Sequence, residues 1–448
     1  MTFLLYILYL MLTYLRPIET YFPELYEFRP VLIFGVLTLF LSILSAGTNK
    51  PQVINRRHIG LISALMFIVP FSRITNGWLG GATDALLAIA PQVAAFILTV
   101  INVNTLRKLK ITILTIFICT IVLILQSLYS YYTGYRTKDY LISQSHLGGG
   151  ESRIEGFSER YKADSALPVD DKSVLWRIRS VGELRDPNDF AQTILAAAPI
   201  LIVGFITATK VEKLLIRIPL LAILSYGLFL TGSRGAVVAA AGMAFFMSYR
   251  RLGKTRASLL VTLTIIIGVA LGFSGGRGIS ANDDSAGGRI EAWSAGFSAW
   301  AQHPLFGVGF GRFLEYHSYT AHNAYVLILT ELGMIGYFFW VSLAMNSVLE
   351  LLKGRAALPP NAPEFNWANC VLLSFVAVAI SSLFLSRSYS TVTYIWIGLM
   401  ACSAAICRNS TSSATVSNEI PWARYSWRFC FLTTGIFYLT VITYNLSG

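Results

Sequence analysis

Charged side chains are scarce in this chain of 448 residues: they make up 13% of it, whereas apolar side chains make up 55%. A typical soluble domain has about 25% charged residues. This scarcity excludes a soluble enzyme and a disordered protein. Cysteine is scarce too, and the five cysteines lie inside or beside apolar runs at spacings that fit neither a zinc site nor a disulfide framework. They are Cys119, Cys370, Cys402, Cys407 and Cys430.

Acidic residues are outnumbered by basic ones, 23 to 35, which gives a net charge of +12. A nucleic-acid-binding protein would cluster its basic residues on one soluble face, with aromatic side chains available for stacking. Here the basic residues lie between long apolar runs. We therefore expect no nucleic-acid partner. No Rossmann-type glycine fingerprint is present, so no nucleotide cofactor is expected.

Long apolar runs dominate what the sequence does contain, and about 20 helical residues cross a bilayer. They predict an all-α polytopic membrane protein with 12 or 13 transmembrane helices. The first run is followed by Arg16-Pro17 rather than by a small-residue cleavage site, which favours a retained helix over a signal peptide. The runs cover approximately 3–15, 31–46, 59–73, 84–102, 110–128, 189–208, 213–231, 235–249, 258–273, 323–349, 368–385, 390–407 and 429–446.

Basic residues in the short loops predict the orientation. One alternating set of loops is rich in Lys and Arg, and the opposite short loops hold only Arg16, Arg29, Arg73, Arg234 and Arg387. The rich set is assigned to the cytoplasm, so two long polar segments fall on the periplasmic side. The predicted organisation is transmembrane helices in 1–128, a periplasmic loop in 129–188, transmembrane helices in 189–273, a periplasmic catalytic loop in 274–322 and transmembrane helices in 323–448.

Polar groups gather at helix ends on that side. Before the sixth run, Asp186-Pro187-Asn188 reads as a turn with Asp189 as the helix cap, although two acids three residues apart also allow a divalent ion. Arg179 and Arg185 have no such local role and remain available to an anion. Arg234 follows a tight turn at a helix N-terminus, where it can attract an anion or reach lipid phosphates.

Two further polar segments follow. Residues 289–300 predict an amphipathic helix at the interface, with Trp293, Phe297 and Trp300 as anchors, and the glycines at 307, 309 and 311 read as turn residues. His317 and His322 are poorly spaced for zinc. Glu331 lies nine residues after His322 in an apolar run, so the two side chains point about 180° apart on a helix.

These segments resemble the bacterial O-antigen ligase superfamily, which includes polysaccharide polymerases and protein O-oligosaccharyltransferases. His322-Asn323, nine residues and then Gly333-Met334-Ile335-Gly336 are similar to its signature. The turn around Arg234 and the segment Gly288-Arg289-Ile290 look like its two arginine positions. Arg179 with Gly182 and the Asp-Pro-Asn-Asp sequence resembles a pattern in its exopolysaccharide-polymerase-like members.

The resemblance implies a membrane glycosyltransferase of surface polysaccharide biosynthesis, for lipopolysaccharide or exopolysaccharide. A glycan moves from an undecaprenyl diphosphate carrier to an acceptor hydroxyl at the periplasmic face of the bacterial inner membrane. Arg234 and Arg289 bind the diphosphate, His322 acts as general base, and the transfer is inverting and needs no metal or other cofactor. Glycan or phosphate binding is expected from Arg179, Asn323, Tyr325 and Arg312.

Three questions stay open at this point. The acceptor is lipid A core in a ligase, another lipid-linked repeat unit in a polymerase, or a protein. A chain-length regulator is a possible partner. The alternative from another class is a transporter or flippase of lipid-linked oligosaccharides, whose polar groups would lie near the bilayer midplane in repeated halves; this sequence has neither feature.

Overall fold

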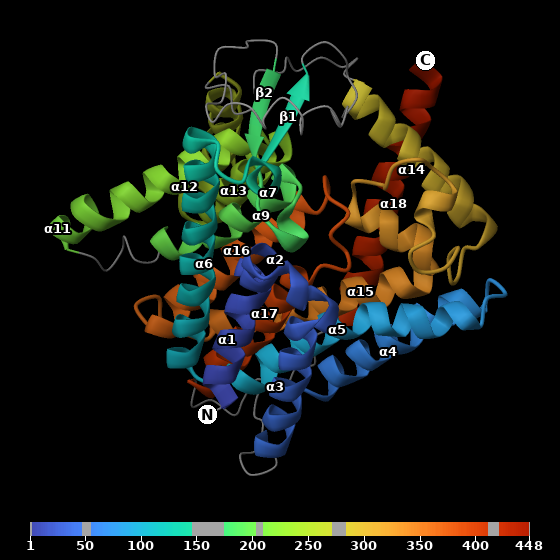
Figure 1. Cartoon of the computed structure of the whole chain (residues 1–448), viewed down its shortest axis with the longest axis horizontal. Helices are drawn as coiled ribbons and strands as arrows, with labels where there is room; N and C mark the ends of the chain where they lie inside the picture. Colours follow the sequence, from blue (N-terminus) through green and yellow to red (C-terminus); the bar gives the residue numbers. More distant parts are fainter. Residues whose placement is uncertain are drawn as a thin grey trace.

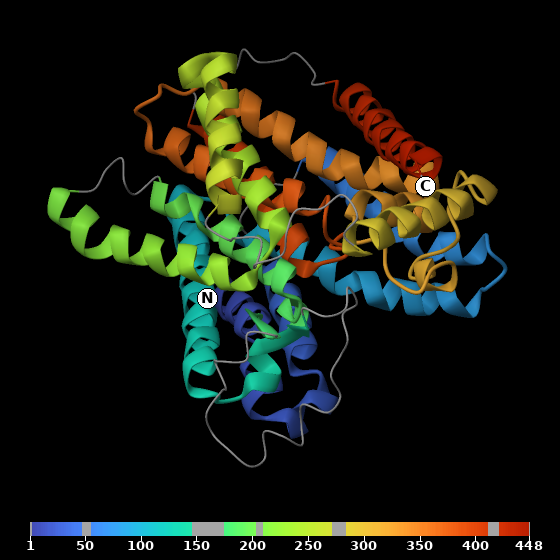
Figure 2. The same ribbon diagram turned by 90° about the horizontal axis from the view of Figure 1, so that it is seen from above.

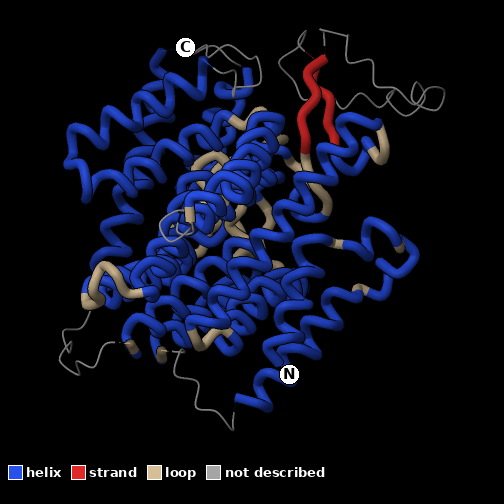
Figure 3. The backbone as a smooth tube through the Cα atoms, turned by 90° about the vertical axis from the view of Figure 1, so that its left-hand side faces the viewer, coloured by secondary structure: helices blue, strands red, loops and turns tan. Residues whose placement is uncertain are grey.

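The computed structural model describes residues 2–46, 55–145, 174–202, 209–270, 284–410 and 421–447. Helices make up nearly all of this part of the chain (Figures 1 and 3). The longer helices are α1 (Thr2–Leu15), α3 (Pro30–Ala46), α4 (Arg56–Ile74), α5 (Gly80–Asn102), α6 (Leu106–Thr133), α9 (Pro187–Ala197), α12 (Ile218–Thr231), α13 (Arg234–Ala270), α14 (Asp284–Gln302), α15 (Ala324–Ala356), α16 (Pro363–Ser381), α17 (Thr391–Asn409) and α18 (Trp422–Ser447).

Short elements connect these helices. They are α2 (Pro17–Tyr21), η1 (Pro23–Phe28), α7 (Thr137–Tyr140), η2 (Gly182–Leu184), α11 (Lys210–Glu212), η3 (Lys213–Arg217), η4 (Phe313–Glu315) and the strands β1 (Leu141–Ser145) and β2 (Val174–Ile178). The strands pair antiparallel, with Leu141 opposite Ile178, in the segment expected to be a periplasmic loop. They are drawn red in Figure 3 and add a small sheet to the predicted all-helical fold.

Eight helices of the described chain are long and apolar enough to cross a membrane. This confirms a mostly helical protein with about eight candidate spans, while the total of 12 or 13 stays a prediction. Three shorter apolar helices cover 2–15, 30–45 and 234–249. The eight candidates are α4, α5, α6, Lys213–Thr231, α15, α16, α17 and the helix from Trp422.

Three predicted spans have different boundaries in the structure. The run expected at 235–249 and the described part of the run expected at 258–273 are joined in α13, and the helical backbone is broken at Gly253; positions 271–273 lie outside the described residues. The run expected at 189–208 begins as the eleven-residue helix α9, and positions 203–208 lie outside the described residues. An apolar run predicts burial or lipid contact, but it does not determine where the backbone breaks.

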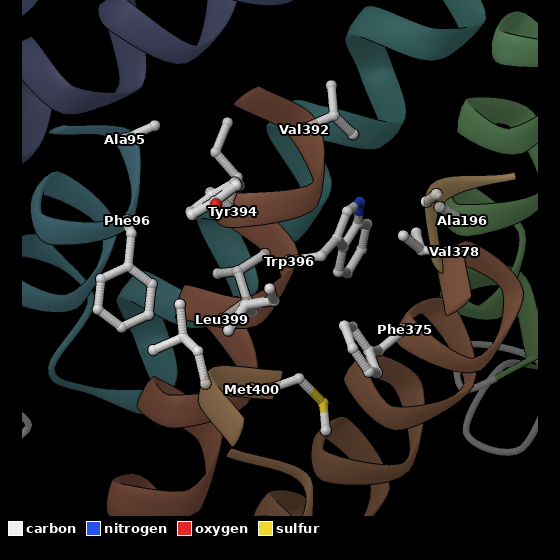
Figure 4. Packing of buried hydrophobic residues seen from close by; sticks show 14 of the residues in the cluster. Ala95, Phe96, Ala196, Phe375, Val378, Val392, Tyr394, Trp396, Leu399 and Met400 are labelled. Atoms are coloured by element: carbon white, nitrogen blue, oxygen red, sulfur yellow. The ribbon is translucent and has the colours of Figure 1, made fainter. Parts of the chain in front are cut away.

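Helices α15 and α17 are the most deeply buried of the eight candidates. Figure 4 shows Trp396 and Met400 of α17 facing Phe375 of α16, whereas Phe96 of α5 lies on the other side of α17. Trp396 is 1% exposed and Met400 is completely buried. Because α17 is enclosed by protein, it provides a fixed support for the segment that precedes it, residues 382–390.

Candidate functional site

The backbone at His322 is left-handed, with φ 44°, a conformation that non-glycine residues adopt rarely. Such a conformation costs about 1–3 kcal/mol and persists only when the surroundings impose it. His322 is the residue immediately before the extended N-cap of α15, Asn323. The structure therefore places this predicted catalytic residue at a constrained point of the chain.

Helix α14 provides one of these constraints. The indole N–H of Trp293 donates a 2.7 Å hydrogen bond to the carbonyl oxygen of Ala321, which is completely buried. The Trp293 ring also packs against Phe437 of α18, with ring centroids 5.2 Å apart. Trp293 and the buried Phe297 thus contact protein, and the expected interfacial anchoring by Trp293 and Trp300 stays a prediction.

The segment between α16 and α17, residues 382–390, provides the other constraints, and we name it the α16–α17 loop. Its Ser382 carbonyl accepts a 2.8 Å hydrogen bond from the Ala324 N–H, and its Ser388 hydroxyl donates a 2.8 Å hydrogen bond to the Ala324 carbonyl. The loop therefore forms hydrogen bonds to both the N–H and the carbonyl of Ala324, the first residue of α15.

The same loop reaches the other side of His322 through Ser386, whose hydroxyl is hydrogen-bonded to the hydroxyl of Thr320. The Thr320 hydroxyl also accepts the backbone N–H of His322, at 3.4 Å. The backbone is thus fastened both before and after His322.

Asn323 caps α15. Its side-chain oxygen accepts the N–H groups of Tyr325 and Val326, at 2.9 and 3.2 Å. The Asn323 side chain is completely buried, and its amide nitrogen has no hydrogen-bond partner in the described part of the chain. Tyr325 is 7% exposed and donates its hydroxyl to the Ala379 carbonyl. Asn323 therefore retains a donor beside His322, whereas Tyr325 is engaged in the core.

Arg289 lies on α14, one helical turn before Trp293. Residues four apart lie on the same helix face, so the bond from Trp293 to Ala321 brings the Arg289 face of α14 to the His322 backbone. The Arg289 side chain is partly buried.

Arg234 is the first residue of α13 and follows the left-handed Gly232, with φ 57°. A Cβ atom added at Gly235 would lie 3.1 Å from the Phe384 side chain, so the start of α13 packs directly on the α16–α17 loop. Seen from above, the yellow-green α13 crosses the orange C-terminal helices, and the gold α14 lies towards the right-hand end of the molecule (Figure 2). The start of α13 and the chain around His322 therefore contact the same loop, whereas α14 contacts the chain at Ala321.

Gly333, the first glycine of the motif, has a conformational role in α15. Gly333 interrupts the helix with φ 66° and ψ −172°, and an added Cβ would lie 2.3 Å from the Leu305 carbonyl oxygen. Across this break, the N–H groups of Val308 and Gly309 donate to the carbonyls of Thr330 and Glu331 at 3.0 Å. The N–H groups of residues 334 and 335 donate to the carbonyls of residues 304 and 305.

This exchange satisfies the backbone groups that the break releases, as a buried helix break requires. It also explains the nine-residue spacing in the motif, because residues 324–332 are the helical stretch between the Asn323 cap and the Gly333 break. The positive φ values at 307, 309 and 311 confirm these glycines as turn residues.

Two predicted binding residues are engaged locally. The Arg179 guanidinium donates to the carbonyls of Lys138 and Arg185, so the expectation that it has no local role is wrong. The Arg312 guanidinium forks onto the Glu315 carboxylate, with Nε 2.9 Å from each oxygen. These hydrogen bonds raise the pKa of Arg312 and lower the pKa of Glu315.

The two acids at the start of α9, Asp186 and Asp189, have different roles from those that the sequence predicts. Asp186, not Asp189, is the N-cap of α9, because Pro187 occupies the first helical position and the Asp186 carboxylate accepts the Asn188 N–H at 2.6 Å. Asp189 is paired with Arg387 instead, at 3.4 Å. Within the described residues, no group of three or more His, Cys, Asp or Glu residues is placed to hold a metal ion.

Sequence reasoning missed Arg387, which it used only to orient the short loops. The side chain is buried and paired with acids about 200 positions earlier in the chain. A single arginine in a short loop carries no signal for such a pairing. Its position directly after the apolar run at 368–385, beside Ser386 and Ser388, is the sequence cue to a polar turn there.

Comparison with known proteins agrees with the motif. A family model described as O-antigen ligase matches residues 219–341, a range that contains Arg234, Arg289, His322 and the Gly333 break. A search among curated proteins finds no match to the chain. The chain is thus a multi-pass membrane protein that carries an O-antigen ligase domain in residues 219–341.

Proposed function

We propose that this protein transfers a glycan from an undecaprenyl diphosphate carrier to the hydroxyl of an acceptor sugar, at the periplasmic face of the bacterial inner membrane. The family match implies a glycan-transferring enzyme with lipid-linked substrates. The acceptor, the side of the membrane and the residue roles are our proposal.

One observation carries the assignment of His322. Its strained backbone is held from α14 and from the α16–α17 loop, through Ala321, Thr320 and Ala324. Strain that the surroundings maintain is characteristic of active sites, where it fixes a functional side chain. An imidazole in this position suits a general base, because its protonation changes near neutral pH.

Arg234 and Arg289 are the proposed diphosphate ligands. Arginine remains charged and presents paired donors to phosphate oxygens, and Arg234 adds the positive end of the α13 dipole. The leaving diphosphate gains negative charge as its bond to the sugar breaks. Contacts to it therefore strengthen in the transition state, which is the condition for catalysis.

The proposed step is a direct displacement. The acceptor hydroxyl oxygen attacks the anomeric carbon, and a new carbon–oxygen bond forms as the bond from that carbon to the diphosphate breaks. His322 takes the hydroxyl proton, and the bonding electron pair leaves on undecaprenyl diphosphate. Attack opposite to the leaving group inverts the anomeric configuration. In this mechanism the two arginines stabilise the negative charge on the leaving diphosphate, and no metal is needed.

Further contacts to substrate are proposed for Asn323, Arg179 and Arg312, and a supporting role is proposed for Tyr325. Asn323 has the best support, because its buried amide nitrogen keeps a free donor next to His322. Arg179 and Arg312 are proposed for glycan or phosphate oxygens, with the guanidinium of Arg312 shared with Glu315. Tyr325 supports the site from behind, where its ring packs 5.6 Å from Trp340.

A transfer assay tests this function. Purified protein in liposomes receives a synthetic undecaprenyl-diphosphate-linked glycan and an acceptor, and the release of undecaprenyl diphosphate is measured. We expect release by wild type and by the control His317→Ala, whose ring nitrogen accepts the nearby Tyr319 N–H. We expect none by His322→Ala. Transport of intact donor without release would support a flippase instead and would overturn the proposal.

The acceptor class is tested in cells. Mass analysis of lipopolysaccharide and secreted polymer from a deletion strain separates the candidates. Full-length glycan stalled on the lipid carrier identifies a ligase, and single repeat units identify a polymerase. The external segment of about 60 residues and its Asp-Pro-Asn-Asp sequence favour a polymerase, which then becomes the candidate for partnership with a chain-length regulator.

A further inference from the structure

The α16–α17 loop has a second set of contacts, on residues 183–189, the segment that leads into α9. These contacts are made by Arg387, which is 9% exposed. Its Nη1 donates to the Glu183 carbonyl oxygen at 2.7 Å and lies 3.4 Å from the Asp189 carboxylate, and its Nη2 lies 3.8 Å from the Glu183 carboxylate. One side chain thus connects two points of the segment to the loop.

Glu183 also contacts the end of the α16–α17 loop through its side chain. Its two carboxylate oxygens accept the hydroxyls of Ser390 and Thr391, at 2.9 and 2.8 Å. Ser390 is the N-cap of α17 and Thr391 is its first residue, so a carboxylate lies at the positive end of that helix dipole. The loop is therefore held against residues 183–189 both by its own arginine and at its junction with α17.

The two sets of contacts lie on one short stretch of chain. Ser386 and Ser388 fasten Thr320 and Ala324 around His322, and Arg387 lies between these two serines. A displacement of Arg387 therefore moves groups that hold the strained backbone of the proposed general base. Loss of the Arg387 guanidinium removes the ion pair of the partly buried Asp189 and leaves Glu183 paired with Arg16, 3.6 Å away, which favours such a displacement.

We infer that Arg387 and Glu183 are positioning residues for the transfer reaction: they fix the α16–α17 loop in the geometry that aims His322. This inference rests on the proposed function. It assigns residues 183–189 a role in setting the catalytic geometry, beyond any contact with glycan.

The experiment compares steady-state kinetics of Arg387→Gln, Arg387→Lys and Glu183→Gln in the full-length protein in liposomes. Misplacing a catalytic group by about 1 Å costs about 100-fold in rate. We therefore expect turnover per folded molecule to fall about 10- to 100-fold in Arg387→Gln, with the KM for the lipid-linked donor almost unchanged. Arg387→Lys should recover part of the loss, since lysine restores the positive charge but lacks the paired donors of the guanidinium group.

The matched control is Arg217→Gln. Arg217 pairs with Glu212 at 2.8 Å, at the opposite end of α12 from Gly232, and it should keep wild-type turnover. A double variant of Arg387 and Glu183 should lose much less than the product of the two single losses, because both act through the same loop.

Each outcome has a defined meaning. Wild-type turnover in Arg387→Gln would overturn the inference, and so would a rise in the donor KM at constant turnover. A lower melting temperature with unchanged turnover per folded molecule would show a purely structural residue and would also overturn it. His322→Ala is measured in parallel: if that variant retains activity, the proposed function has failed, whereas its inactivity beside a fully active Arg387→Gln rejects only the positioning role.

Discussion

The indole N–H of Trp293 donates a 2.7 Å hydrogen bond to the carbonyl oxygen of Ala321, the residue directly before His322. Helix α14, which carries Arg289 one turn earlier, is thereby connected to the backbone of the proposed general base. The connection links a proposed phosphate ligand and a proposed base through one side chain, and it can be removed without removing either of them.

Trp293→Phe keeps an aromatic ring against Phe437 and deletes only the donor. A buried acceptor left without a partner costs about 1–3 kcal/mol, so we expect transfer to slow about fivefold or more. The measurement is turnover in the liposome assay. Trp300→Phe is the control, since the hydrogen bond from its indole N–H to the Pro304 carbonyl is exposed and makes no contact with residues 320–324. Equal losses in the two variants would argue against the connection.

Arg234 and Arg289, the two proposed diphosphate ligands, are tested by glutamine variants, which remove the charge, and by lysine variants, which keep the charge and change the donor geometry. Losing one charged contact of about 1.5–3 kcal/mol slows transfer roughly ten- to a hundredfold, which we expect for Arg234→Gln and for Arg289→Gln. The lysine variants should recover only part, because lysine lacks the paired donors. Arg256→Gln, an exposed position of α13, is the control. Full activity in both glutamine variants would remove the phosphate-binding role.

Asn323 combines a capping oxygen with an unbonded amide nitrogen, and one substitution separates the two. Asn323→Asp keeps the cap and replaces the donor by a carboxylate oxygen that repels phosphate. We expect a large loss of turnover and some loss of stability, because the new carboxylate oxygen is buried without a partner. Asn323→Ala removes both groups and should also lower stability by about 0.5–2 kcal/mol. An active Asp variant would restrict Asn323 to capping.

The apolar runs predicted helices such as α4–α6, α15 and α17, because period and length are local properties of the chain. They could not predict how Gly333 is used, since its conformation depends on a loop near residue 305 that fills the break. The contact of Arg387 with Glu183 spans 204 residues and leaves no local pattern. The motif did identify two segments that contact the α16–α17 loop, the start of α13 and the chain around His322, because its residue types are tied to the chemistry.

The ion pair between Arg312 and Glu315 predicts how the KM for donor depends on pH. Hydrogen bonds from Arg312 hold the pKa of Glu315 below its ordinary 4.5, so the pair is fully present above pH 4.5 and is lost only as the pH falls through the lower folded value. Between pH 5.5 and 8, wild type and Glu315→Gln should therefore differ by a constant factor in the KM for donor.

The direction of that difference tests Arg312 as a binding residue. Glu315→Gln releases its guanidinium to a substrate anion, so we expect the KM to fall. The control is Asp139→Asn, which breaks the corresponding pair with Arg136, also three residues apart in sequence. A KM that rises, or a factor that changes within this pH range, would contradict the prediction.

Gly333→Ala should destabilise the protein by several kcal/mol and abolish transfer, because it combines an unfavourable φ with a Cβ 2.3 Å from a backbone oxygen. Neither the Leu305 carbonyl nor α15 can move without breaking the hydrogen bonds that pair residues 304–309 with 330–335.

The matched control is Gly60→Ala in α4, where an added Cβ meets nothing within 4 Å and the backbone is helical. Alanine is the better helix former, so this variant should be as stable as wild type or slightly more stable. Thermal unfolding in detergent and the liposome assay distinguish the two variants. A stable, active Gly333→Ala protein would mean that the break in α15 is not needed to hold the His322 loop, and that the glycine spacing in the motif has another cause.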